Sequence, residues 1–193
     1  MLFDRATSVF GGAGLDYELV LVDDGSKDGT WGLISEFAAS GSAPHVRAVS
    51  FSRNFGKESA LLAGLEHAGG DVVGIMDADL QQDPETLLAM YRELLARPDA
   101  DCVAAYQSER HEGRLQAALK RRFYRVFRAT TEGCADMIPE ASDFRVFTKD
   151  VASALVSMPE YHRFSKGLFA WVGFNTVPLS LIHISEPTRL QLI

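Results

Sequence analysis

The sequence predicts an α/β fold with a mostly parallel sheet flanked by helices. Through the first hundred residues, apolar runs of strand length alternate with stretches of helical periodicity, as in a parallel sheet with crossover helices. Of the 193 residues, 47% are apolar and 23% charged, which suits one folded domain with a core. The sequence has no uninterrupted apolar run of about 18 residues, so no membrane span is predicted.

Five strands are expected, each from a short run rich in Val, Ile, Leu or Ala: residues 17–22, 46–51, 71–76, 101–106 and 144–148. Helices are expected over residues 2–10, 28–40, 56–68, 83 to about 97, and 150–158. Their starts have recognisable signals. Asp28 is a candidate N-cap, Gly56 opens the third helix, and Asp83-Pro84-Glu85 places a proline in the first turn of the fourth.

Composition excludes several classes of protein. Nineteen Lys and Arg residues against 26 Asp and Glu give a net charge of −7, which disfavours a nucleic-acid partner. The two cysteines, Cys102 and Cys134, are too few for a disulfide framework or a zinc knuckle. We therefore expect buried thiols in a reducing compartment.

Two adjacent carboxylates, Asp23 and Asp24, follow the first predicted strand and precede a glycine-containing turn. Open α/β sheets bind ligands just beyond the carboxyl ends of their strands. A carboxylate at that position can accept hydrogen bonds from ribose hydroxyls or a base N–H. The alternative is an ordinary turn with a helix cap, because Asp and Gly are common turn residues.

A second pair of carboxylates, Asp77 and Asp79, follows the third predicted strand, and Gln81 adds an amide oxygen two residues later. Such oxygen ligands suit a hard divalent ion, so the sequence implies Mg²⁺ or Mn²⁺ bridging the phosphates of a nucleotide. A single D-x-D is common in surface turns. Its position after a buried strand, with the other acidic pair after an earlier strand, makes the metal interpretation stronger.

Two further features suit anions. Gly56 begins a helix whose backbone N–H groups can meet an anion, and Lys57 adds positive charge, unless it is simply a solvated first-turn lysine. Residues 110–128 carry seven positive charges interleaved with Leu, Phe and Tyr, which suits an anionic membrane surface and a lipid-borne phosphate. The alternative is a solvated basic helix whose aromatic side chains pack on the sheet.

Together these motifs resemble family 2 glycosyltransferases with the GT-A fold. The likeness is to the polyprenyl-phosphate branch, related to dolichol-phosphate mannose synthase and bactoprenol glucosyltransferase. The motifs are VDDGSKDGT, FSRNFGKESALLAGL, DADLQQDPE, SDFRVF and HRFSKGLFAWVGF, and the resemblance covers about residues 2–178.

The resemblance implies a role for each motif. The donor side would comprise Asp23, Asp24, Asn54, Lys57, Asp77 and Arg163, the last in a lid over the donor with His162. The metal would be held by Asp77, Asp79 and Gln81. The catalytic and acceptor-side residues would be Asp79, Arg110, Arg114, Arg121, Asp143 and Arg145. From sequence alone, Asp143 and Arg145 could equally form a surface ion pair.

The implied reaction moves a hexose, with inversion, from a donor of the UDP-glucose or GDP-mannose type to a polyprenyl (undecaprenyl or dolichyl) phosphate. It would take place at the cytoplasmic face of a membrane. The acceptor phosphate is largely ionised at pH 7, since its second pKa is about 6, so no strong general base is needed.

Three alternatives compete with this interpretation. A phosphohydrolase of the haloacid-dehalogenase type would place the D-x-D before the other acidic pair, the reverse of the order here. A processive polysaccharide synthase would carry Gln-x-x-Arg-Trp where this chain has HRFSKG. The third alternative is a truncated, non-catalytic domain that binds nucleotide sugar weakly or not at all.

The two ends of the sequence differ from the family pattern. Residues 1–178 are expected to form a partial GT-A domain. Residues 179–193 are expected to be a non-native tail, because LSLIHISEPTR resembles a translated sequencing-library adapter. The family's first strand, with Pro-x-Tyr-Asn-Glu, would lie between the strands at residues 17–22 and 71–76. No strand is predicted before Tyr17, so two unpaired inner edges, poor solubility and no transfer by this chain alone are expected.

Overall fold

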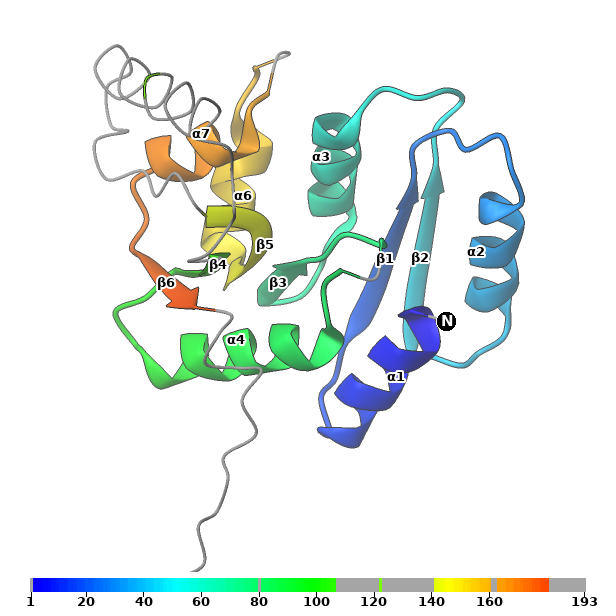
Figure 1. Cartoon of the computed structure of the whole chain (residues 1–193), viewed down its shortest axis with the longest axis horizontal. Helices are drawn as coiled ribbons and strands as arrows, with labels where there is room; N and C mark the ends of the chain where they lie inside the picture. The colour runs from blue at the N-terminus through cyan, green and yellow to red at the C-terminus, as the bar shows by residue number, and fades with distance from the viewer. Residues whose placement is uncertain (1, 80, 107–121, 123–140, 161–162, 181–193) are drawn as a thin grey trace, which may run out of the picture.

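The computed structural model describes residues 2–79, 81–106, 122, 141–160 and 163–180 (Figure 1). In chain order its elements are α1 (Leu2–Gly12), β1 (Glu18–Asp23), α2 (Thr30–Ala39), β2 (His45–Ser50), α3 (Lys57–His67), β3 (Val72–Ile75), α4 (Pro84–Ala96), β4 (Cys102–Tyr106), β5 (Ala141–Thr148), α6 (Lys149–Ser157), α7 (Ser165–Trp171) and β6 (Thr176–Ser180). The alternation of strands and helices confirms the predicted α/β class.

The sheet consists of two separate parts. β1 and β2 form a parallel pair, and the other four strands form a sheet in the order β3-β5-β4-β6. β5 runs antiparallel to both β3 and β4, whereas β6 is parallel to β4. The larger part is therefore mixed, because β5 returns between two strands that run in the same direction.

Helices cover both faces of the sheet (Figure 1). On one face, Leu65 of α3, Leu155 of α6 and Phe169 of α7 pack with Cys102 and Phe147 of the sheet. The opposite face of β4 and β5 packs against α4 in a second apolar cluster. Phe10 of α1 meets α4 in a third cluster, which half-buried Leu19 of β1 joins. Alternate residues of β5 thus face two different helical layers, as a strand's two-residue period requires.

Two elements were not predicted, α7 and β6. Pro178 lies within β6, and proline within a strand-like run argues against a strand, although an edge strand such as β6 tolerates it. β6 pairs with β4 as far as Ser180, which lies opposite Tyr106. Leu179 and Ser180, assigned to the tail from sequence, are therefore in the sheet. Residues 181–193 lie outside the described part.

The sheet is interrupted between β1 and β3. Within the described residues, β1 pairs with β2 alone and β3 with β5 alone, so each has one unpaired edge. This is the interruption expected from the sequence. The burial of the strands reflects this difference in pairing. β4 is paired on both sides and is buried over Cys102–Ala105. In β1, Asp23 alone is buried and the other residues are half-buried.

Hydrogen exchange tests this asymmetry. Unpaired backbone N–H groups exchange with solvent more readily than those in a strand paired on both sides. We expect amides of β1 to exchange faster than amides of β4 when peptides covering residues 18–23 and 102–106 are compared by mass spectrometry. Equal protection of the two peptides would contradict the open edge of β1.

Candidate active site

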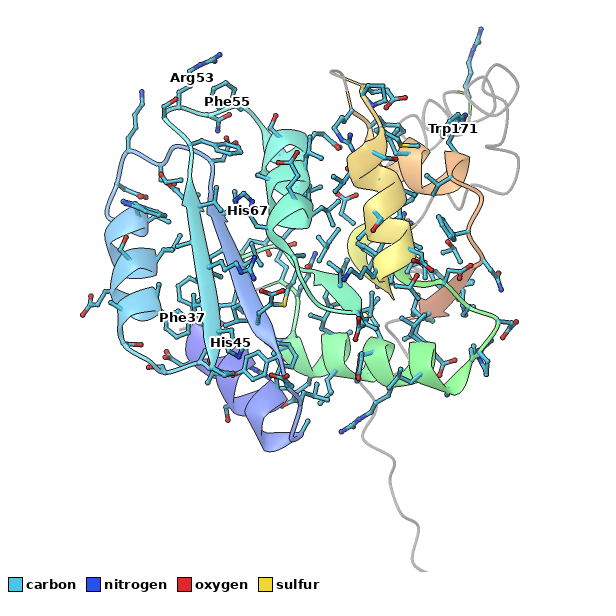
Figure 2. The ribbon with its side chains drawn as sticks, turned by 180° about the vertical axis from the view of Figure 1, so that it is seen from behind. Phe37, His45, Arg53, Phe55, His67 and Trp171 are labelled. Carbon is cyan, nitrogen blue, oxygen red and sulfur yellow. The ribbon has the colours of Figure 1, made fainter. Side chains whose placement is uncertain are left out.

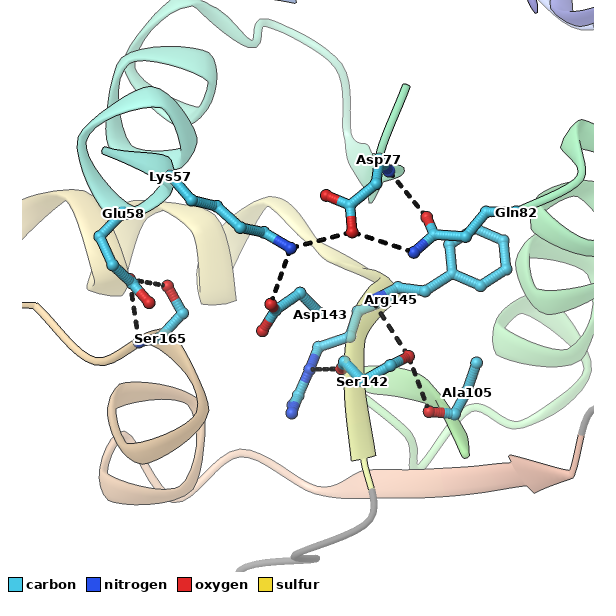
Figure 3. A network of polar contacts seen from close by, with 10 residues as sticks. Lys57, Glu58, Asp77, Gln82, Ala105, Ser142, Asp143, Arg145 and Ser165 are labelled. Carbon is cyan, nitrogen blue, oxygen red and sulfur yellow. Dashed lines mark hydrogen bonds and ion pairs between the residues drawn. The ribbon is translucent and has the colours of Figure 1, made fainter. Parts of the chain in front are cut away.

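Lys57, at the first position of α3, joins two carboxylates from different strands (Figure 3). Its Nζ lies 2.9 Å from Oδ2 of Asp77, just beyond the end of β3, and 3.0 Å from Oδ2 of Asp143 on β5. The carboxyl ends of β2 and β3 therefore meet at one edge of the protein, as expected for ligand-binding α/β sheets. The alternative of a simply solvated Lys57 is wrong.

The charge of Lys57 is maintained by these contacts. Burial by itself lowers the pKa of the ammonium, but the hydrogen bonds to Asp77 and Asp143, with the charges of both carboxylates, outweigh burial and raise the pKa above its usual value. Lys57 is therefore a cation at neutral pH. Two carboxylates that would otherwise repel one another can lie on either side of it.

Gln82 fixes the orientation of Asp77. Its Oε1 accepts a hydrogen bond from the backbone N–H of Asp77 at 2.7 Å, and its Nε2 donates to Oδ2 of Asp77 at 3.3 Å. The sequence singled out Gln81 and missed Gln82. Gln81 is exposed, and its backbone N–H donates to Oδ1 of Asp79 at 3.0 Å. Asp79 is exposed as well, in the turn that follows Asp77.

The first acidic pair holds two loops together. Asp24 accepts hydrogen bonds from the backbone N–H groups of Phe55 at 2.7 Å and Gly56 at 2.9 Å. Asp23 is 4% exposed and accepts from the backbone N–H of Ser26 and the hydroxyl of Ser50, each at 3.3 Å. These contacts are the ones expected if Asp23 and Asp24 stabilise a turn. Their nucleoside role stays a prediction.

The loop between β2 and α3 packs directly on the turn after β1. Gly25 has a φ of +69°, and a Cβ there would lie 2.3 Å from the carbonyl carbon of Arg53. The guanidinium of Arg53 lies 4.2 Å from the ring centroid of Phe55, which is 48% exposed at the loop tip (Figure 2). Asn54, between them, is exposed. The predicted donor loop thus has a defined position and an open outer surface.

Arg145 does not lie beside Lys57. It is 4% exposed, its Nε donates to the carbonyl of Ser142 at 3.0 Å, and its guanidinium lies 4.4 Å from the ring centroid of Phe169 in α7. Burial lowers the pKa of this guanidinium below its usual value. The alternative of a surface pair between Asp143 and Arg145 is wrong, since Arg145 is buried and Asp143 pairs with Lys57.

Arg163 and Glu58 organise the neighbouring helices. Arg163 donates to the carbonyls of Met158 at 3.2 Å and Leu155 at 2.9 Å, which satisfies the carboxyl end of α6. Glu58 accepts from both the backbone N–H and the hydroxyl of Ser165, the first residue of α7 (Figure 3). Glu58 was not predicted. It links the start of α3 to the segment containing Arg163.

Several predicted residues lie outside the described part of the chain. These are Arg110, Arg114 and Arg121 of the basic segment, His162 of the predicted lid, and Cys134. Cys102 is described and is a buried free thiol whose pKa is raised by burial.

The described carboxylates fit a divalent ion that shares its coordination with a substrate. Over those residues, no three His, Cys, Asp or Glu side chains are arranged to hold a metal by themselves. Mg²⁺ is usually bound by one or two carboxylates together with phosphate oxygens and water, so a closed protein cage is not required. Asp77 and Asp143 already converge on one cation, the ammonium of Lys57.

The candidate residues lie at one edge of an α/β sheet, and sequence relationships give the family of the chain. The family described as "Glycosyl transferase family 2" matches residues 4–154. The chain belongs to this family. This finding decides against the haloacid-dehalogenase alternative.

Relatives of known name are similar over most of the chain. A prophage bactoprenol glucosyl transferase homolog of Escherichia coli (strain K12) is 38% identical over 162 residues, which is 83% of this chain and 51% of the relative. The bactoprenol glucosyl transferase of Shigella phage SfV has the same identity and coverage. The chain therefore spans about half the length of the curated relatives it matches.

Solved structures share the fold. A mannosyltransferase from Pyrobaculum calidifontis, in complex with GDP-Man and Mn²⁺, has a TM-score of 0.57 and 22% identity over 94% of this chain and 52% of its own. Glucosyl-3-phosphoglycerate synthase from Mycobacterium tuberculosis, in complex with Mn²⁺, UDP-Glc and phosphoglyceric acid, has a TM-score of 0.58 and 19% identity over 91% and 65%. The expected GT-A fold is thereby confirmed.

No helix in the described ranges combines the length and the apolar character needed to cross a membrane.

The close packing of Gly25 on Arg53 gives a stability prediction. Gly25→Ala should lower the free energy of unfolding through both the left-handed backbone, about 1–2 kcal/mol, and the clash with Arg53, about 1–3 kcal/mol more. Gly41→Ala is the matched control, because Gly41 also has a φ of +69° but has open space around its Cβ position. Urea denaturation that gives equal losses for both variants would contradict the packing described here.

Proposed function

We propose that this chain is the catalytic domain of a metal-dependent enzyme that transfers a hexose from a nucleotide diphosphate sugar to a polyprenyl phosphate. The observation that carries the proposal is the convergence of Asp77, Asp143 and Lys57 at the carboxyl edge of the sheet, in a chain of family 2. The bactoprenol glucosyl transferases among its relatives support a polyprenyl-phosphate acceptor. The related folds that hold UDP-Glc or GDP-Man with Mn²⁺ support a nucleotide-sugar donor and a divalent ion.

The proposed metal ligands are Asp77, Asp79 and Gln81. Asp77 is oriented by Gln82, and Asp79 follows it in a turn exposed to solvent. A divalent ion there would neutralise the charge that develops on the diphosphate as it leaves.

The proposed donor pocket lies along the loops after β1 and β2. Asp23 and Asp24 fix the turn and the loop that carries Asn54 and Phe55. The exposed faces of these loops are available to a nucleoside, and Lys57 supplies positive charge near the diphosphate. Arg163 donates a hydrogen bond to α6 and would contact the donor from the segment before α7. Glu58 links this segment to α3 through Ser165.

On the acceptor side, the proposal assigns Arg110, Arg114 and Arg121 to the lipid phosphate, with Asp143 and Arg145 nearby. An ionised phosphate oxygen attacks the anomeric carbon directly, so these residues would position it rather than remove a proton. Arg145 would act by holding β5 against α7, because its guanidinium is buried under Phe169. We place the reaction at the cytoplasmic face of a membrane. Trp171, 53% exposed on α7, suits the polar boundary of a bilayer (Figure 2).

The metal assignment predicts a large loss of activity on neutralising either carboxylate. In a version of the protein with the full length of its relatives, Asp77→Asn and Asp79→Asn should each lower polyprenyl transfer at least about 100-fold. Asp71→Asn, at the opposite end of β3, is the control because it makes the same change in charge away from the site. Transfer within a few-fold of the unmodified protein in Asp79→Asn would show that this residue is not a ligand.

The basic segment is predicted to serve the acceptor. Arg110→Ala and Arg114→Ala should raise KM for the polyprenyl phosphate about tenfold or more, since a hydrogen bond to a charged group is lost. KM for the nucleotide sugar should change little. Arg92→Ala, on the exposed side of α4, is the control. A raised donor KM with normal lipid kinetics would reverse the assignment.

A further inference from the structure

The ammonium of Lys57 forms ion pairs with two carboxylates, those of Asp77 and Asp143. Nζ is 2.9 Å from Oδ2 of Asp77 and 3.0 Å from Oδ2 of Asp143 (Figure 3). We propose that Lys57 is an exchangeable counter-ion. In the metal-free protein it neutralises both carboxylates, and on metal binding it is displaced and becomes available to the donor diphosphate. This inference rests on the proposed function, which assigns Asp77 to the metal.

The two cations compete for the same charge. Mg²⁺ approaches carboxylate oxygens to about 2.0–2.1 Å, closer than the ammonium lies to Asp77. Oδ2 of Asp77 already accepts from Lys57 and, at 3.3 Å, from Nε2 of Gln82. A divalent ion at either oxygen of this carboxylate would lie a few ångströms from Nζ and repel it. The metal therefore binds at the expense of the contacts of Lys57.

Lys57 can leave without unfolding the site. Its side chain is 47% exposed, whereas the side chain of Asp143 is 21% exposed. Lys57 is in the first turn of α3, so its flexible four-carbon stem can turn outward while the helix stays in place. Asp77 is held by the Gln82 hydrogen bonds independently of Lys57. The carboxylate thus keeps its orientation when the ammonium departs.

Mn²⁺ binding to the 193-residue chain without nucleotide tests the competition, by calorimetry or by the electron paramagnetic resonance signal of free Mn²⁺. Lys57→Met should bind Mn²⁺ about five- to tenfold more tightly, because two partly exposed ion pairs no longer oppose the metal. Lys57→Arg, which keeps the charge, should bind like the unmodified chain. Lys27→Met is the control, since it removes a lysine from the exposed turn after β1. Asp77→Asn tests the metal site itself.

A second measurement needs no variant. Amine acetylation of the unmodified chain, followed by mass spectrometry, should modify Lys57 more rapidly when Mg²⁺ is added, while the rate at Lys27 stays constant. This readout detects release of the ammonium directly. It therefore applies even if a Lys57 variant folds poorly.

The outcomes separate the inference from the proposed function. Weaker Mn²⁺ binding in Asp77→Asn, with unchanged or weaker binding in Lys57→Met, would overturn the exchange but leave the metal site. Undetectable binding in both the unmodified chain and Lys57→Met would also overturn the exchange. An equal gain in Mn²⁺ affinity in Lys27→Met and Lys57→Met would show that the effect comes from net charge alone. That result would overturn the exchange. Unchanged Mn²⁺ binding in Asp77→Asn would remove the metal site of the proposed function, and the exchange with it.

Discussion

The ion pairs of Lys57 with Asp77 and Asp143 are the contacts on which the candidate site depends. They join the start of α3, the end of β3 and the beginning of β5 at one point. Residues 57, 77 and 143 are far apart in sequence, so only the folded sheet brings them together. The ammonium offsets the repulsion between two carboxylates. Both side chains can therefore lie at the same point of the fold.

The start of α3 also connects the two parts of the interrupted sheet. Asp24, after β1, holds the backbone of Phe55 and Gly56 immediately before the helix. One residue later Lys57 bonds to the larger sheet, and Glu58 bonds to α7. The four consecutive residues 55–58 thus contact the turn after β1, the carboxylates of Asp77 and Asp143, and the first residue of α7.

Much of the fold could be predicted from sequence because its elements have strong local signals. The strands at β1 to β4 are compact apolar runs, and Asp83 caps α4 through the backbone N–H of Glu85 as its sequence predicted. α7 and β6 were missed because one is seven residues long and the other contains Pro178, so neither has a clear period. Their positions are set by packing of Phe169 on Phe147 and by pairing with β4.

The site was predictable in part for the same reason. Acidic residues that follow buried strands point to the ligand-binding edge, which is why Asp23, Asp24 and Asp77 could be singled out. The sequence could not show that Gln82 orients Asp77, since this contact depends on tertiary geometry. Nor could it show that Asp143 and Arg145 face different surroundings. Both are on the same side of β5, but Arg145 lies beneath α7 and Asp143 reaches α3.

We propose that a divalent ion binds at the carboxyl edge of the sheet around Asp77. Paramagnetic broadening by Mn²⁺ in amide NMR spectra of the isotopically labelled chain tests this most directly, because the effect falls steeply with distance from the ion. Resonances of residues 77–82, Asp143 and the start of α3 should broaden first. Resonances at the opposite end of the sheet, such as Asp71 and Asp101, should persist. Broadening centred on that opposite end, or on no defined site, would contradict a metal site at Asp77.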